Sequence, residues 1–137
     1  AILLNVGIND TPTIGQKNGR HQLEIDGFEY GLERLIFEMK SQTQVFVIGL
    51  TPVDEKKMPF AGCLWYSNDF CNSYERRMEE VCINQNVPFL PTFREMYSDL
   101  RTKNWISDDG IHLNSNGHLW IYQRIKSWDI LKKWKES

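Results

Sequence analysis

Two side chains toward the C-terminal end of the chain have the types and spacing of an acid–base pair. Asp109 and His112 lie three residues apart in the segment SDDGIHLNSNGH (residues 107–118), and Gly110 between them favours a tight turn. At this spacing the carboxylate can accept a hydrogen bond from one imidazole nitrogen, which leaves the other nitrogen to take up a proton. The pair therefore has the composition of the base and the orienting acid of a hydrolytic triad.

Two alternatives exist for this segment. His112 can be a turn histidine beside a solvated Asp109. Asp108, Asp109, His112 and His118 are also potential metal ligands. No cysteine or further histidine lies nearby, and His118 would sit one helical turn into the next element, so we predict neither a metal nor another cofactor.

Asn9 is a third candidate, because it follows an apolar run that ends at Gly7 in the segment VGIND. A side-chain amide at the tip of a strand offers two N–H donors on a rigid element, and such donors stabilise a developing oxyanion. Asn and Asp are also ordinary turn formers after a strand, so this short segment alone favours a plain turn at Asn9 and Asp10.

Strands and helices alternate along the chain. Apolar runs predict buried strands at residues 1–6, 44–50 and 87–90. Apolar side chains at helical spacing predict helices over residues 21–41, from Ser67 or Asn68 to Cys82, over residues 93–100, and from about Ser115 past Leu131. This alternation predicts an α/β fold with a parallel sheet covered on both faces. Ligands bind at the carboxyl ends of such strands, where Asn9, the loop after Pro52 and the segment before the last helix emerge.

The same patterns predict which helical side chains are buried. In the last helix the inward residues are expected to be Leu119, Tyr122, Ile125 and Leu131. A run of charged residues is expected to form the solvated face of the preceding long helix: Glu75, Arg76, Arg77, Glu79 and Glu80.

Composition narrows the class of protein. A length of 137 residues fits one domain, and 41% apolar with 25% charged residues is ordinary for a folded globular protein. A formal charge of -2 without a basic stripe argues against nucleic acid as a partner, and no apolar run is long enough for stable membrane insertion. Three cysteines, an odd number, favour a reduced, cytoplasmic compartment, an inference that a leader before Ala1 would overturn.

Together these segments resemble the SGNH/GDSL hydrolase family of serine esterases. The turn from Gly7 to Asp10 is similar to the third sequence block of that family, and Asp109 to His112 to its fifth, a hundred residues further on. The strand and loop VIGLTP, residues 47–52, are similar to the family's penultimate strand. The resemblance runs from Gly7 to about Trp134 and implies a three-layer α/β/α, flavodoxin-like sheet.

The resemblance also implies roles for individual residues. It implies cleavage of carboxylic esters without a cofactor, with Asn9 donating to the oxyanion and Gly7 and Asp10 supporting it. His112 would act as general base and then acid, and Asp109 would orient it. The substrate would be a small-molecule ester, whose identity the fold does not fix.

The nucleophile of that family is missing from this chain. A Gly-Asp-Ser turn and a glycine N–H of the oxyanion hole both precede the third block, whereas this chain begins at the strand that leads into it. Thr51 ends a strand, but Pro52 after it has no N–H to offer. We therefore expect an N-terminally incomplete domain over residues 1–137, inactive alone and of marginal stability, whose first strand is an apolar edge open to association.

Trp65 and Trp105 fall in loops that should border the catalytic edge, where they could line an acyl or alcohol pocket, although packing is the commoner role of tryptophan. A second hypothesis for the whole chain is a catalytically inactive domain of the same fold that binds a carbohydrate or a protein. A third, a flavodoxin-like nucleotide binder, is disfavoured because the chain has no glycine-rich phosphate loop before a helix.

Overall fold

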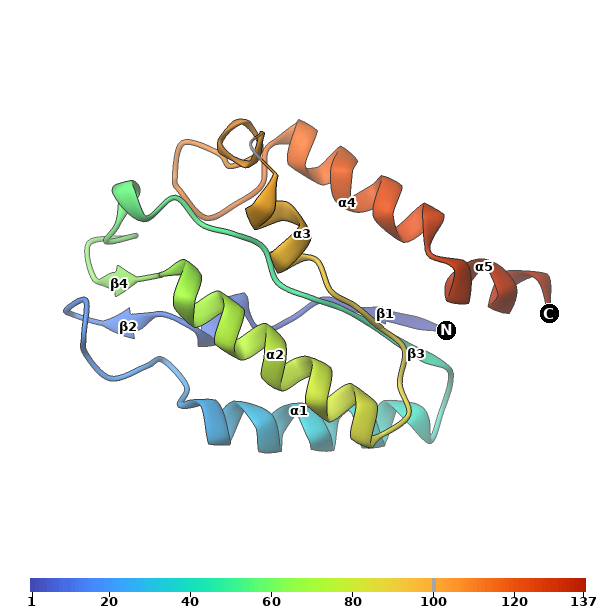
Figure 1. The fold of residues 1–137 in the computed structure, drawn as a ribbon. Coiled ribbons are helices and arrows are strands. Elements are labelled where there is room, and N and C mark those ends of the chain that lie inside the picture. Colours follow the sequence, from blue (N-terminus) through green and yellow to red (C-terminus); the bar gives the residue numbers. More distant parts are fainter. Residues whose placement is uncertain (100) are drawn as a thin grey trace.

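The computed structural model describes residues 1–99 and 101–137, and it has the α/β architecture that the alternating pattern predicts (Figure 1). Three parallel strands form the main sheet in the order β1-β3-β5: β1 (Ile2–Leu4), β3 (Val45–Ile48) and β5 (Phe89–Leu90). All four residues of β3 are buried, as expected for a central strand in a parallel sheet.

Helices cover both faces of this sheet, which gives the three layers that the resemblance implies. On one face, α1 (Ile25–Lys40) and α2 (Asn68–Asn84) pack their apolar stripes against Val45 and Val47. Phe46 points to the other face, where Trp128 and Leu131 pack beside it. Figure 1 shows α4 and α5 on the opposite side of the sheet from α1 and α2.

Shorter elements connect these layers. Two short strands that the sequence did not predict, β2 (Thr13–Ile14) and β4 (Leu64–Trp65), pair antiparallel beyond the end of the main sheet. Single 3-10 turns lie at Ile8–Asp10 (η1), Glu55–Lys57 (η2) and Thr102–Asn104 (η3), and α3 spans Phe93–Ser98. Leu100, which the sequence pattern assigns to the α3 stripe, lies outside the described residues.

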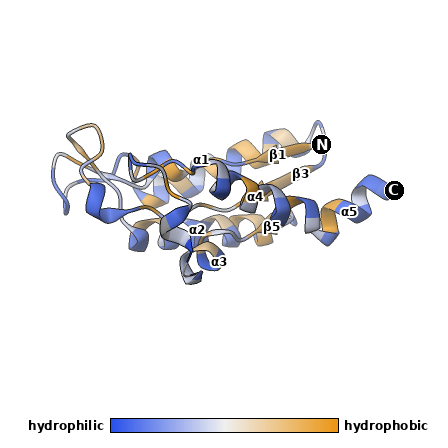
Figure 2. Cartoon of the chain, turned by 90° about the horizontal axis from the view of Figure 1, so that it is seen from above, coloured by the Kyte–Doolittle hydropathy of each residue, from blue (hydrophilic) through white to orange (hydrophobic). Residues whose placement is uncertain are grey.

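The single last helix that the sequence predicts is two helices, α4 (Ser115–Ser127) and α5 (Asp129–Glu136). Trp128 between them has extended backbone, so one apolar stripe cannot continue through it. Leu131 is buried as expected, but Leu119 and Tyr122 are 52% and 58% exposed, and the prediction that they face inward is wrong. The hydropathy coloring of Figure 2 shows α4 and α5 as mixed polar and apolar helices.

The prediction that Glu75 lies on the solvated face of α2 is also wrong, because this side chain is buried and only 2% exposed. Its Oε2 accepts hydrogen bonds from the backbone N–H groups of Leu50 at 2.8 Å, Phe93 at 2.9 Å and Thr92 at 3.3 Å. Burial raises the pKa of this carboxyl, and the three N–H donors oppose that shift. The buried acid therefore joins the segments that follow β3 and β5.

β1 lies at one edge of the sheet formed by the described residues. Leu4 of β1 is buried, whereas Leu3 on the strand and Val6 just after it are exposed, so the prediction of a buried strand over residues 1–6 is wrong for those two side chains. The edge leaves one side of an apolar strand unpaired within the described sheet, which is the arrangement that favours addition of another strand.

Two general features complete the fold. None of the helices in residues 1–99 and 101–137 combines the length and apolar character that crossing a bilayer requires. Cys63, Cys71 and Cys82 are free thiols, and burial raises the pKa of Cys71 and of Cys82 to about 12.

Candidate active site

Asp109 and His112 meet in a tight turn between η3 and α4. Asp109 Oδ2 lies 2.6 Å from Nδ1 of His112. The other carboxylate oxygen, Oδ1, accepts from the backbone N–H groups of Ile111 at 2.9 Å and His112 at 3.0 Å. One carboxylate therefore fixes both the turn and the imidazole, and because it is bound to Nδ1 it leaves Nε2 as the nitrogen available for proton transfer.

Backbone contacts hold this turn in place. Ser107 N–H donates to the carbonyl of His112 at 2.7 Å, and Asp54 N–H donates to the carbonyl of Gly110 at 2.8 Å. Gly110 has φ +84°, and a Cβ there would lie 2.5 Å from Cβ of Lys57. Glycine is required at this position on both counts, because side chains disfavour that φ and there is no space for one.

The Asp109 carboxyl has a pKa lowered to about 2, chiefly because of the backbone hydrogen bond from Ile111 and then the bond with His112. Its value in an unfolded chain is near 3.8. A depressed pKa means that the charged carboxylate stabilises the folded state above the unfolded value, and that this contribution is lost as the pH falls toward about 2.

The Asp109→Asn variant tests this linkage. Asparagine keeps one oxygen for the two backbone N–H donors but loses the charge, so we expect a lower melting temperature than the parent chain at pH 7. Near pH 2 the parent carboxylate is half protonated, and the difference between the two melting temperatures should shrink. Thermal melts followed by circular dichroism measure this; a constant difference at both pH values would contradict it.

Asn9 is held on η1 at the end of β1. Gly7 has φ +111°, and a Cβ there would lie 3.1 Å from the Phe28 ring, so glycine is needed for the chain to turn against α1. Asn9 is exposed, and its Oδ1 accepts a hydrogen bond from the Tyr66 hydroxyl at 3.3 Å. Burial raises the pKa of the neighbouring Asp10 carboxyl.

Asn9 and His112 border the same hydrophobic cluster at the carboxyl end of the sheet. Their neighbours Ile8 and Ile111 both pack in this cluster. The Phe60 ring connects the two sides, with its centroid 6.2 Å from that of Tyr66 and 6.3 Å from that of His112. The amide and the imidazole are thus linked through two aromatic rings; their catalytic roles stay predictions.

Both tryptophans predicted for the substrate pocket are at least half-buried. Trp105 is buried, with its ring 5.6 Å from Trp120. Trp65 is half-buried on β4, and within the described residues its Nε1 is a buried donor with no acceptor. Their role in binding substrate stays a prediction.

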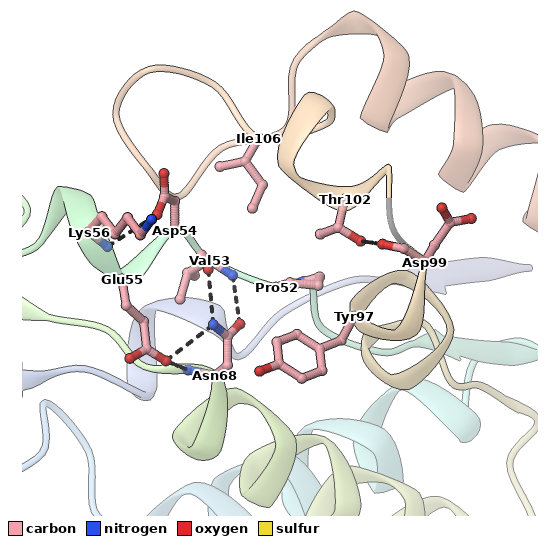
Figure 3. A pocket seen from close by; sticks show the side chains of 10 residues that line it. All are labelled: Pro52, Val53, Asp54, Glu55, Lys56, Asn68, Tyr97, Asp99, Thr102 and Ile106. Atoms are coloured by element: carbon pink, nitrogen blue, oxygen red, sulfur yellow. Dashed lines mark hydrogen bonds between the residues drawn. The ribbon is translucent and has the colours of Figure 1, made fainter.

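A cavity of about 520 Å³ lies beside the Asp54 segment, whose backbone is bonded to the turn that carries Asp109 and His112 (Figure 3). Figure 3 shows Asn68 at one side of the cavity, where its amide bonds both backbone groups of Val53 and the carboxylate of Glu55. Tyr97 and Ile106 face each other across it. Its lining comprises Pro52, Val53, Asp54, Glu55, Lys56, Asn68, Tyr97, Asp99, Thr102 and Ile106. The cavity thus shares the Asp54 loop with the turn, but its lining contains none of the predicted site residues.

Sequence reasoning missed Tyr66, Phe60 and the Asn68 network. Tyr66 and Phe60 belong to the long loop after Pro52, whose length was the one signal of a functional segment. The described residues hold no group of three or more His, Cys, Asp or Glu side chains placed to bind a metal ion.

The chain is similar to known proteins in sequence and in fold. The model of the GDSL-like Lipase/Acylhydrolase family matches residues 1–120. A crystal structure of the lipase/acylhydrolase from Enterococcus faecalis is similar in fold, with a TM-score of 0.74 and 20% identity over 90% of this chain and 57% of that one. A protein from Lactobacillus plantarum gives a TM-score of 0.63 and 17% identity over 91% of this chain and 64% of that one.

This chain therefore spans less than two thirds of the length of either structure. No curated protein matches it. The two structural likenesses bear on the fold alone, which agrees with the parallel sheet and its covering helices. The family match covers most of the sequence, including every residue from Gly7 to His112, and on this ground the chain belongs to the GDSL-like lipase/acylhydrolase family.

Proposed function

We propose that this domain is part of a serine ester hydrolase, in which His112 and Asp109 form the base and its orienting acid. The observation that carries the proposal is the 2.6 Å contact between Asp109 Oδ2 and His112 Nδ1 in a turn fixed by backbone hydrogen bonds. Family membership supports the same chemistry, and Asn9 on η1, which follows β1, would supply the amide donors for an oxyanion.

In this mechanism the serine oxygen attacks the ester carbonyl carbon while Nε2 of His112 takes the serine proton. The carbonyl oxygen gains negative charge, which the Asn9 N–H groups stabilise. The tetrahedral intermediate collapses, the imidazolium gives its proton to the leaving alcohol, and an acyl-enzyme remains. Water, activated by the same imidazole, then releases the acid. Asp109 holds the imidazole and stabilises its positive charge throughout.

The serine is proposed to come from outside these 137 residues, on a strand that pairs with β1. β1 is an apolar edge with Leu3 exposed, and the chain continues from it through the exposed Val6 to Gly7 and Asn9. A parallel strand added there ends beside Asn9, because the carboxyl ends of parallel strands share one edge of the sheet. The same edge is the surface through which the chain alone would associate with other strands.

A fluorophosphonate probe tests the proposal. The chain of residues 1–137 should stay unlabelled. The longer polypeptide that includes the residues encoded upstream of Ala1, called the extended protein below, should be labelled at one serine, because the probe reacts only with an activated nucleophile. Labelling of the extended protein should be lost when that serine is replaced by alanine. An extended protein that stays unlabelled, or an upstream sequence without a Gly-Asp-Ser turn, would refute the hydrolase proposal and favour the inactive binding domain.

A further inference from the structure

We propose that Tyr66 is a positioning residue that sets which end of the Asn9 amide faces the substrate. This inference rests on the proposed hydrolase function and adds a residue to its site. Tyr66 lies on the loop between β4 and α2, 57 positions from Asn9 in the sequence.

The buried Tyr66 hydroxyl donates its hydrogen to Asn9. The side chain is 5% exposed, and a buried hydroxyl needs a hydrogen-bond partner. Within the described residues, the acceptor that it has is Oδ1 of Asn9 at 3.3 Å. Burial, with smaller contributions from Cys71 and Asp10, raises the pKa of the phenol. The group therefore stays protonated and continues to donate at neutral pH.

This donation decides the orientation of the amide. An asparagine side chain has an acceptor end, Oδ1, and a donor end, Nδ2, and the two can exchange by rotation about one bond. An oxyanion is stabilised by the donor end and repelled by the acceptor end. The Tyr66 oxygen could also accept from Nδ2, but its own buried hydrogen would then lose the acceptor that Oδ1 provides among the described residues. The pairing with Oδ1 is therefore favoured, and it leaves the Nδ2 hydrogens for the reacting oxygen.

The ring of Tyr66 is itself fixed. It packs edge-on against Phe60 with centroids 6.2 Å apart, and Val53 and Ile111 belong to the same buried cluster. Phe60 in turn packs against the His112 ring. The ring that directs the Asn9 amide is therefore held by the same cluster that borders the general base, so the two are positioned together.

The Tyr66→Phe variant removes the hydroxyl and keeps the ring. In the extended protein we expect kcat for p-nitrophenyl acetate to fall about fivefold, the size of one neutral hydrogen bond, with KM unchanged. Rates are counted per serine titrated with the fluorophosphonate probe, so that unfolded protein does not contribute. Tyr74→Phe is the matched control, because Tyr74 is also buried and its hydroxyl donates elsewhere, to the Leu23 carbonyl at 2.6 Å.

A double-mutant cycle separates positioning from a general packing role. Asn9→Ala should lower kcat by on the order of 100-fold, and adding Tyr66→Phe to it should cause no further loss, because the amide that Tyr66 directs is gone. A fivefold loss that persists in the Asn9→Ala background, or a Tyr66→Phe variant as active as the Tyr74→Phe control, overturns the inference and leaves the hydrolase proposal intact. Full activity of Asn9→Ala itself overturns both the positioning by Tyr66 and the oxyanion role of Asn9.

Discussion

Replacing His112 by alanine in the extended protein is expected to lower kcat/KM for p-nitrophenyl acetate by at least about 10⁴-fold. In the proposed mechanism the imidazole both removes the serine proton and returns it to the leaving alcohol, and the Asp109 carboxylate holds it by Nδ1. Initial rates over a range of substrate concentrations give the loss, which should fall on kcat.

His118→Ala serves as the matched control for this prediction. His118 is exposed on α4, six residues further along the chain, and it lies outside the turn. Its replacement should leave kcat/KM within about twofold of the parent, because isolated surface substitutions are nearly neutral. Similar losses in the two histidine variants would mean that neither acts as the specific base.

Glu75→Leu is expected to destabilise the fold by about 4 kcal/mol, because it leaves three buried backbone N–H groups without an acceptor. These donors belong to Leu50, Thr92 and Phe93, and Glu75 Oε2 is the oxygen that they share. Urea unfolding of the extended protein measures the change. Glu80→Leu on the exposed face of the same helix should shift the free energy of unfolding by less than about 0.5 kcal/mol.

Glu75→Gln separates the hydrogen bonds from the charge. Glutamine keeps an oxygen for the three N–H donors, so the loss should stay below about 1 kcal/mol at pH 7. The folded pKa of Glu75 is raised above its ordinary value of 4.5, so the native state binds the proton more tightly than the unfolded state. The contribution of Glu75 to stability therefore falls as the pH rises from 4.5 through its raised folded pKa. The glutamine variant has no such carboxyl and should lack this fall. Equal pH dependence in both proteins would contradict the assignment.

Local patterns were sufficient for most of the fold. The apolar run from Val45 to Ile48 and the helical stripe of α1 are each set by neighbours close in sequence, and both elements formed within the ranges predicted for them, 44–50 and 21–41. Ser67 or Asn68 was expected to begin α2, and the structure makes Ser67 the cap, with its Oγ accepting from the Phe70 N–H at 3.2 Å. The short pair β2 and β4 was not predicted, because two residues give no periodicity and the partners are far apart in sequence.

The candidate site likewise has a part that the sequence could predict and a part that it could not. Asp109 and His112 are three residues apart, so their contact depends on one turn, and the residue types were enough to suggest it. Asn9 and Tyr66 come together only through the tertiary fold. Glu75 was misassigned because the charge pattern of α2 carries no information about the strand ends that it meets, where free N–H groups require an acceptor.

The turn that carries Asp109 and His112 is tied to the neighbouring segments through main-chain atoms, which has a consequence for how such a domain can diversify. Hydrogen bonds from Asp54 N–H to Gly110 and from Ser107 N–H to His112 do not depend on which side chains those donors carry. Residues along the 54–57 loop can therefore exchange over evolution, reshaping the adjoining cavity, while the imidazole keeps its position. Gly110 and Gly117 cannot exchange in this way. A methyl group would collide with Lys57 at position 110 and with the Trp105 carbonyl at position 117.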